Sequence, residues 1–124
     1  LLAEALATLA LSELAALFAP EGRAEVDIAG TLADGTLVSG RIDRLVVLPE
    51  RVLVADFKTD RRVPGSLAAV PRAHVDQIAA YARLLARLYP GRRIEPLLVY
   101  TAGPRVWALT EARLWTEGEG LTSE

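Results

Sequence analysis

The chain has no cysteine and no methionine, a single histidine and few aromatic residues among its 124 positions. The absence of cysteine excludes disulfides, thiolate zinc sites and cysteine nucleophiles, and it fits the reducing cytoplasm in which we expect the protein. A bound metal ion must therefore be held by oxygen ligands or by the one histidine, His74.

Long uninterrupted hydrophobic runs are also absent. Residues 1–18 are rich in alanine and leucine at helical spacing, but Glu4 and Glu13 interrupt them and no basic stretch precedes them. This pattern predicts an amphipathic helix that packs on a core, rather than a membrane span or a signal peptide. We expect no contact with a membrane.

The chain also lacks an excess of basic residues. The formal net charge is −2, whereas proteins that coat nucleic acid neutralise many phosphates with lysine and arginine. A local basic rim is compatible with this charge, and Arg61, Arg62 and Arg72 are its candidates. The alternative for Arg61 and Arg62 is that they are ordinary loop charges kept in water.

The residues that are present suffice for one domain over positions 1–124, with 52% hydrophobic and 24% charged residues. Periodicity and turn residues predict a helix at 1–18, strands at 24–30, 36–48 and 51–58, a helix at 71–88, and strands at 94–101 and 105–109. The tail at 116–124 is expected to be flexible. This order gives an α/β domain with its core at about 24–110.

Two acids and a lysine stand near the ends of two consecutive predicted strands. Asp43 ends the segment Gly-Arg-Ile-Asp, and Asp56 and Lys58 belong to the segment Asp-Phe-Lys. A hairpin between these strands brings both carboxylates together, and strand alternation places Asp56 and Lys58 on one face. Paired carboxylates can hold Mg²⁺ while the lysine orients or deprotonates a water near a phosphate.

A short Asp-x-Lys pattern also arises by chance, and an exposed acid–lysine pair contributes little beyond solubility. The functional interpretation gains weight from the order of the other signals. Gly40 to Asp43 lie upstream of the pattern, and Gln77 and Tyr81 lie on one face of the helix downstream. We therefore interpret the set as a phosphodiester-hydrolysis site.

This ordered set resembles the PD-(D/E)XK nucleases and, within them, the RecB-like nuclease domain in the C-terminal region of bacterial AddA-type helicase-nuclease subunits. The resemblance covers nearly all of residues 24–109. It implies a restriction-endonuclease-like core, which is a central mixed β-sheet flanked by helices.

The resemblance also implies roles for individual residues. Asp43, Asp56 and the backbone carbonyl of Phe57 would bind the metal, and Lys58 would serve the attacking water. Gln77 and Tyr81 would contact a phosphate or fix Lys58. For Tyr81 the alternative is a core aromatic with a hydrated hydroxyl.

Two further residues are candidates for site support or DNA contact. The family often has a glutamate on the strand before the Gly-x-Ile-Asp segment, so Glu25 either ligates metal or supports the site. Alternation predicts Arg41 on the same face as Asp43 and Arg44 on the opposite face, which makes Arg41 the better phosphate contact. The alternative for both arginines is a solvated strand face.

The histidine departs from the family pattern. These nucleases carry a histidine ligand on a helix before the glutamate strand, whereas His74 follows the Asp-Phe-Lys segment. We predict that His74 is a solvated or capping residue near a helix start, not a replacement ligand. The missing histidine, the missing initiator methionine and the missing Walker A pattern lead us to expect a fragment of a larger helicase-nuclease, without its motor domains and inactive in isolation if its metal site is incomplete.

The resemblance implies an Mg²⁺-dependent DNA exonuclease, with Mn²⁺ as a possible substitute, that hydrolyses phosphodiester bonds. It would form part of an ATP-dependent helicase/exonuclease in double-strand break repair and homologous recombination. Its partners would be single-stranded and double-stranded DNA and a second, AddB-type helicase-nuclease subunit. The alternative function is a catalytically incomplete nuclease-fold module that binds DNA or a partner subunit.

Overall fold

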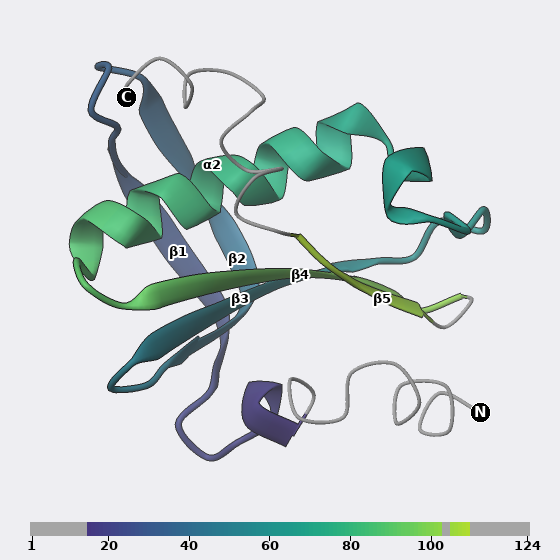
Figure 1. Cartoon of the computed structure of the whole chain (residues 1–124), viewed down its shortest axis with the longest axis horizontal. Coiled ribbons are helices and arrows are strands. Elements are labelled where there is room, and N and C mark those ends of the chain that lie inside the picture. Colours follow the sequence, from purple (N-terminus) through teal and green to yellow (C-terminus); the bar gives the residue numbers. More distant parts are fainter. Residues whose placement is uncertain (1–14, 103–104, 110–124) are drawn as a thin grey trace.

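The computed structural model of the chain describes residues 15–102 and 105–109 (Figure 1). Its strands are β1 (Arg23–Thr31), β2 (Leu37–Val47), β3 (Arg51–Lys58), β4 (Arg93–Tyr100) and β5 (Arg105–Ala108). A short 3-10 helix, η1 (Leu67–Ala69), and the long helix α2 (Arg72–Leu88) connect β3 to β4. The bounds of the strands and of α2 agree with the sequence prediction to within one or two residues.

The strands form one five-stranded sheet in the order β1-β2-β3-β4-β5. The pairs β1–β2, β2–β3 and β4–β5 are antiparallel, whereas β3 and β4 are parallel. Short turns suffice for antiparallel neighbours, but a parallel pair needs a long crossover, and α2 provides it. The mixed sheet predicted from the sequence is therefore confirmed.

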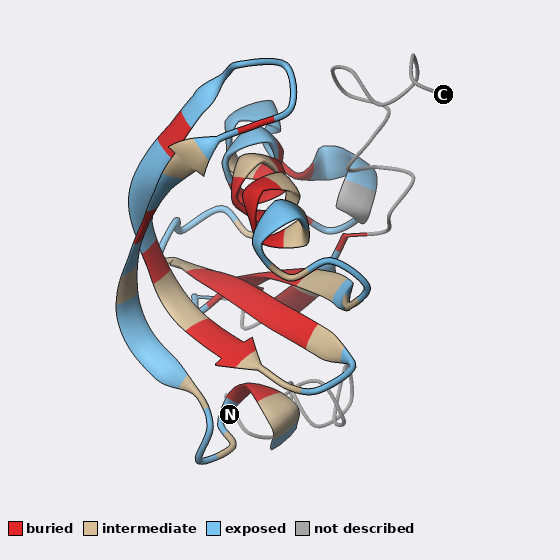
Figure 2. Ribbon diagram, turned by 90° about the vertical axis from the view of Figure 1, so that its left-hand side faces the viewer, coloured by how far each residue is buried: buried red, intermediate tan, exposed pale blue. Residues whose placement is uncertain are grey.

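Both faces of the sheet are covered (Figure 2). Val52 and Val54 of β3 pack in the cluster that contains the buried side of α2. Leu53 and Ala55 point the other way and pack with Leu17, which belongs to a short helical segment at residues 15–17. The strict alternation along β3 thus serves two separate cores, as expected of a sheet between helices.

Some predicted segments lie outside the described residues. These are positions 1–14 of the predicted first helix and the predicted tail at 116–124. Within the described ranges, no helix is both long and apolar enough to span a membrane.

Candidate active site

Side-chain alternation along β2 shifts by one residue at Asp43. Val38 and Ile42 pack in the cluster beneath α2, but the next residues of β2 in that cluster are Leu45 and Val47. An unbroken strand would keep the same parity throughout, because successive side chains point to opposite faces. Before Asp43 the even-numbered side chains of β2 face α2, and after it the odd-numbered ones do. Asp43 therefore lies at the point where this exchange occurs.

The neighbouring strand carries the matching irregularity. Glu25 has a φ of 55°, the one positive φ of a non-glycine residue among those described. The β1–β2 pairing includes Ala24 with Arg44 and Val26 with Ile42, but omits the intervening pair of Glu25 and Asp43. Left-handed backbone is unfavourable for a residue with a Cβ, so the position is strained.

The shift directs Asp43 toward the end of β3. The β2–β3 pairing stops at Arg44 with Ala55, and Asp43 Oδ2 accepts a hydrogen bond of 2.7 Å from the backbone N–H of Phe57. In a strand, the N–H and C=O of one residue face the same neighbour, so the Phe57 carbonyl also lies on the side of Asp43. The carbonyl predicted as a metal ligand is thus placed beside the first acid.

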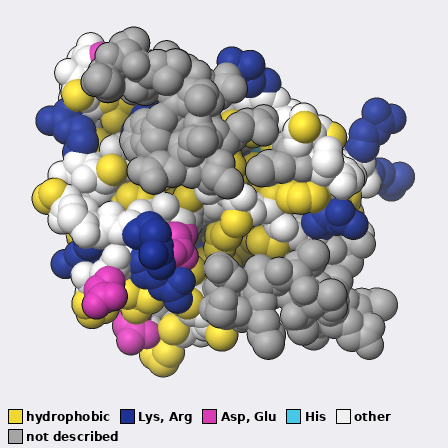
Figure 3. Space-filling model, viewed as in Figure 1, with side chains coloured by type: hydrophobic (Ala, Val, Ile, Leu, Met, Phe, Trp, Pro, Cys, Tyr) yellow, Lys and Arg dark blue, Asp and Glu magenta, His cyan; other side chains and the backbone are white. Residues whose placement is uncertain are grey.

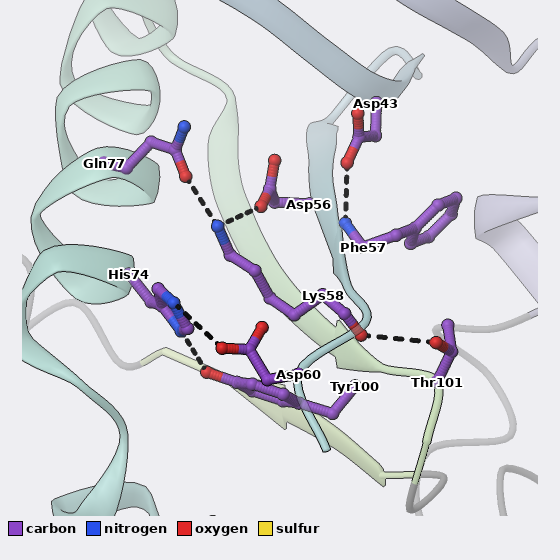
Figure 4. Close-up of polar contacts among 9 residues, drawn as sticks. All are labelled: Asp43, Asp56, Phe57, Lys58, Asp60, His74, Gln77, Tyr100 and Thr101. Carbon is purple, nitrogen blue, oxygen red and sulfur yellow. Dashed lines mark hydrogen bonds and ion pairs between the residues drawn. The ribbon is translucent and has the colours of Figure 1, made fainter. Parts of the chain in front are cut away.

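Asp56 and Lys58 share the face of β3 that looks toward α2, as alternation predicted. The Lys58 Nζ lies 2.8 Å from Asp56 Oδ2 and donates a hydrogen bond of 2.9 Å to Gln77 Oε1 (Figure 4). The side chains of Lys58 and Asp56 are only 16% and 9% exposed. Gln77 therefore fixes the Lys58 ammonium, one of the two roles expected for it.

The main chain of Lys58 is held as well. Its carbonyl accepts a 2.9 Å hydrogen bond from the Thr101 backbone N–H and a 3.3 Å bond from the Thr101 hydroxyl. Thr101 was not among the residues predicted from the sequence, because only the parallel register of β3 and β4 brings it next to Lys58. A polar residue at the end of the predicted buried strand 94–101 was the one available signal.

Burial and the two neighbouring charges act on Asp56 in opposite directions. Burial raises the pKa of its carboxyl above the ordinary value, Lys58 lowers it, and the adjacent carboxyl of Asp43 raises it again. The net effect is an increase, because a carboxylate is poorly solvated at this position and has a like charge beside it. Such a pair of acids favours a shared cation.

The donor set fits magnesium in its chemistry. Mg²⁺ prefers oxygen ligands and is often bound by one or two carboxylates, with water or substrate oxygens completing its shell. Asp43, Asp56 and the Phe57 carbonyl would supply oxygens on one side. Across residues 15–102 and 105–109, no group of three or more histidine, cysteine or acidic side chains is placed to hold a metal. Asp43 and Asp56 are two acids of this part of the chain that lie close enough for their charges to interact.

Tyr81 is a core residue rather than a contact of Lys58. It is 6% exposed, and its hydroxyl occupies the space that a Cβ on Gly40 would need. The glycine of the Gly-x-Ile-Asp segment is thus explained by a tyrosine on α2, four residues after Gln77. This contact joins the helix to the strand that carries Asp43.

The expected face of Arg41 is wrong. The parity shift puts Arg41 on the side of β2 away from α2, where its Nε lies 3.0 Å from Asp27 Oδ1. Glu25, the other candidate, lies there too, with Oε1 3.9 Å from Arg41 Nη1 and a side chain that is 73% exposed. Both side chains belong to a solvated ion-pair group, and Arg44 instead donates to the Leu17 carbonyl.

His74 is not the solvated residue that the sequence suggested. Its side chain is 17% exposed, its Nδ1 lies 2.6 Å from the Tyr100 hydroxyl, and its Nε2 lies 3.8 Å from Asp60 Oδ2. The prediction failed because Tyr100 approaches α2 only through the parallel pairing of β4 with β3.

The candidate basic rim is partly occupied by internal contacts. Arg72 forms an ion pair with Asp76, with 3.5 Å between Nε and Oδ1, whereas Arg61 and Arg62 are exposed. On the face seen in Figure 3, lysine and arginine side chains lie in separate groups. The view therefore shows local positive charge and not one continuous basic surface.

Comparisons with known proteins identify the family of the chain. Residues 2–118 match the family described as the PD-(D/E)XK nuclease superfamily. No curated protein matches the chain significantly. Among solved structures, the chain is similar to "Crystal structure of SSO0001", with 20% identity, a TM-score of 0.46 and 84% of this chain covered. The match covers 50% of that structure's chain, so the present chain spans about half its length.

Proposed function

Because the chain belongs to the PD-(D/E)XK nuclease superfamily, we propose that it is an Mg²⁺-dependent deoxyribonuclease domain that hydrolyses phosphodiester bonds. One observation carries the proposal. Asp43 and Asp56, from two different strands, stand together with an ammonium that is held by Asp56 and Gln77 at 2.8 and 2.9 Å. This arrangement supports a site for a cation, a water and a phosphate.

Each residue has a role in this proposal. Asp43, Asp56 and the Phe57 carbonyl would hold the cation, and a cation there supplies charge stabilisation and activates water for attack. Lys58 orients the attacking water and stabilises the negative charge that develops on the phosphoryl oxygens. Gln77 and Thr101 hold Lys58 at its ammonium and at its carbonyl, so little reorganisation is required when the substrate arrives.

We extend the proposal to the biological setting on the basis of the ordered sequence motifs. The domain acts as an exonuclease on single-stranded and double-stranded DNA, within an AddA-type helicase-nuclease in the cytoplasm. ATP-dependent unwinding by the parent protein supplies the DNA strands, and an AddB-type subunit completes the complex in double-strand break repair and recombination. Manganese substitutes for magnesium because it accepts the same oxygen ligands.

A second candidate is a catalytically incomplete nuclease-fold module that binds DNA or a partner subunit. The observation that favours it is that no group of three or more histidine, cysteine or acidic side chains in the described part of the chain is placed to hold a metal. The contacts of Lys58 argue against this candidate. A module that only binds would not need a lysine held in place by both Asp56 and Gln77.

The test is a calorimetric titration of Mg²⁺ and Mn²⁺ into the purified chain, together with cleavage of end-labelled single-stranded and double-stranded DNA. Asp56→Asn removes one proposed ligand at nearly constant shape. Asp27→Asn is the matched control, because Asp27 is also ion-paired but lies in the solvated group.

We expect metal binding and cleavage in the wild type and in Asp27→Asn, and loss of both in Asp56→Asn. Metal binding without cleavage, lost in Asp56→Asn, would favour the incomplete module. Equal binding in all three proteins would contradict the proposed metal site.

A further inference from the structure

A second polar group lies beside Lys58, and the proposed chemistry does not use it. It consists of His74 on α2, Tyr100 at the end of β4 and Asp60 just after β3 (Figure 4). We call these three residues the His74 clamp. Tyr100 is completely buried, His74 is mostly buried, and the side chain of Asp60 is 46% exposed.

The contacts of the clamp are consistent with one placement of the protons on the Tyr100 hydroxyl and the His74 ring. Burial, followed by the charges of Asp60 and Asp56, raises the pKa of Tyr100 to about 12, so its hydroxyl keeps its proton at neutral pH. That hydroxyl can donate to His74 Nδ1 at 2.6 Å when the imidazole proton sits on Nε2, which faces Asp60. The two ring nitrogens thereby have different partners.

These partners exclude other roles for the ring. A metal ligand or a phosphate donor needs a nitrogen directed at the ligand, whereas both nitrogens of His74 face groups of the protein itself. Asp60 also places negative charge beside Nε2, which disfavours a phosphate there. His74 therefore acts through other residues.

The residues that it can act through are close by in the fold. Tyr100 is the register partner of Lys58 in the parallel β3–β4 pair, and Asp60 follows Lys58 by two residues. Gln77, which holds the Lys58 ammonium, lies three residues after His74 and nearly one helical turn away. The clamp thus ties the start of α2 to both strands that position Lys58.

We propose that His74 is a positioning residue: through Tyr100 and Asp60 it sets the place of α2, and so holds Gln77 against the Lys58 ammonium. Only the expected effect of His74 on the rate of DNA cleavage rests on the proposed nuclease function. The placement of Gln77 itself is a property of the metal-free and DNA-free protein, so it can be measured separately.

The first experiment follows the side-chain amide resonances of Gln77 by NMR in the metal-free chain. His74→Phe keeps a ring but removes both nitrogens, Tyr100→Phe removes only the hydroxyl, and His74→Asn keeps a polar group near Nδ1. We expect the Gln77 amide to shift in His74→Phe and in Tyr100→Phe, with His74→Asn close to wild type.

Arg87→Gln is the control for a general effect on the helix. Arg87 lies at the far end of α2 and donates to the Thr31 carbonyl at 2.6 Å. This variant should leave the Gln77 amide in place. An unchanged Gln77 amide in His74→Phe, or an equal shift in Arg87→Gln, would overturn the proposal.

The second experiment measures kcat and KM for DNA cleavage. Loss of one positioning hydrogen bond should lower kcat about tenfold in His74→Phe, with KM nearly unchanged and with recovery in His74→Asn. In a Gln77→Ala background, His74→Phe should have little further effect, because both changes act on the same ammonium. A full effect of His74→Phe in that background would refute action through Gln77.

The two experiments separate this proposal from the nuclease function. If the wild type does not cleave DNA, the nuclease proposal fails, while a Gln77 shift in His74→Phe and Tyr100→Phe still supports the clamp. If the wild type cleaves and Gln77 does not respond, the clamp proposal fails alone.

Discussion

Two acid–base pairs of this protein have nearly the same geometry and different surroundings. Arg41 and Asp27, on β2 and β1, lie 3.0 Å apart, and Lys58 and Asp56, both on β3, lie 2.8 Å apart. The side chains of the first pair are 60% and 78% exposed, whereas those of the second are 16% and 9% exposed. In the exposed pair Asp27 raises the pKa of Arg41, and in the other pair burial raises that of Asp56.

The difference between the two pairs is one of solvation. Arg41 and Asp27 form the outer pair, and Lys58 and Asp56 form the inner pair. Water solvates the outer pair, so each of its charges is stabilised with or without the other. The inner pair lies between α2 and the sheet next to a second carboxylate, where each charge needs a partner. Each pair joins a basic side chain to an aspartate, and it is the inner pair that we propose to take part in cation binding.

The largest expected effect is on catalysis by the inner pair. Lys58→Met should lower the cleavage rate by about 10²–10⁴-fold, the usual range for a group that serves a reacting water. Binding of Mg²⁺ should persist or strengthen, because a positive charge beside the carboxylates is removed. Single-turnover cleavage and calorimetry measure the two effects. A Lys58→Met enzyme with undiminished rate would make the inner pair no more functional than the outer one.

The next effect concerns the contact that joins α2 to the β2 strand. A methyl group in Gly40→Ala would meet the buried Tyr81 hydroxyl, and overpacking of this kind typically costs about 1–3 kcal/mol of unfolding free energy. Urea denaturation measures the loss. Tyr81→Phe in the same chain should restore part of it, because it removes the clashing oxygen.

Gly65→Ala is the matched control for this contact, since an added Cβ there has no atom within 4 Å. It should leave stability nearly unchanged. Equal losses in Gly40→Ala and Gly65→Ala would show that the Tyr81 contact is not the cause.

A pH profile of stability tests the effect of burial on Asp56. Because the folded state raises the pKa of Asp56, folded protein holds this proton over a range in which the unfolded chain has lost it. The contribution of Asp56 to stability is therefore fully present below the ordinary aspartate pKa and decreases as pH rises through the higher folded value. Wild type should lose stability relative to Asp56→Asn from acid to neutral pH.

Urea denaturation at several pH values without metal tests this, and Mg²⁺ at neutral pH should restore stability to the wild type alone. A wild type that gains stability over Asp56→Asn with rising pH would mean that Lys58, not burial, dominates at Asp56.

The smallest expected effect is at the outer pair. Arg41→Gln should change the urea midpoint only slightly, and that change should shrink further at high salt, because exposed pairs are screened. The comparison is with Lys58→Met under identical conditions. A large decrease of the urea midpoint in Arg41→Gln that persists at high salt would show that the outer pair stabilises the fold. Exposure would then be a poor guide to the energetic contribution of an ion pair in this fold.

Much of the site followed from local patterns. The strands, α2 and the shared face of Asp56 and Lys58 were predictable because periodicity and turn residues report on backbone geometry over a few residues. Gln77 was predictable from its place in an ordered motif. The exchange of faces at Asp43 was not, because it accompanies an irregularity on another strand, at Glu25.

The contacts of His74 and Thr101 also could not be predicted from local patterns. Each interacts with a residue at least 26 positions away, His74 with Tyr100 and Thr101 with Lys58. These contacts exist because β3 and β4 run parallel, and no spacing within either segment encodes that register. The sequence pattern alone therefore predicted a solvated or capping role for His74.

The sequence by itself determined the order of the elements, the two-faced β3 strand and the set of oxygen-bearing side chains available to a metal, since these depend on neighbours along the chain. Only the tertiary structure decided which acid meets which. It buried Asp56, turned Asp43 toward Phe57, and left Glu25 and Arg41 in water. The physical reason is that solvation and charge proximity, which set the chemistry of a carboxylate, depend on residues brought together by folding.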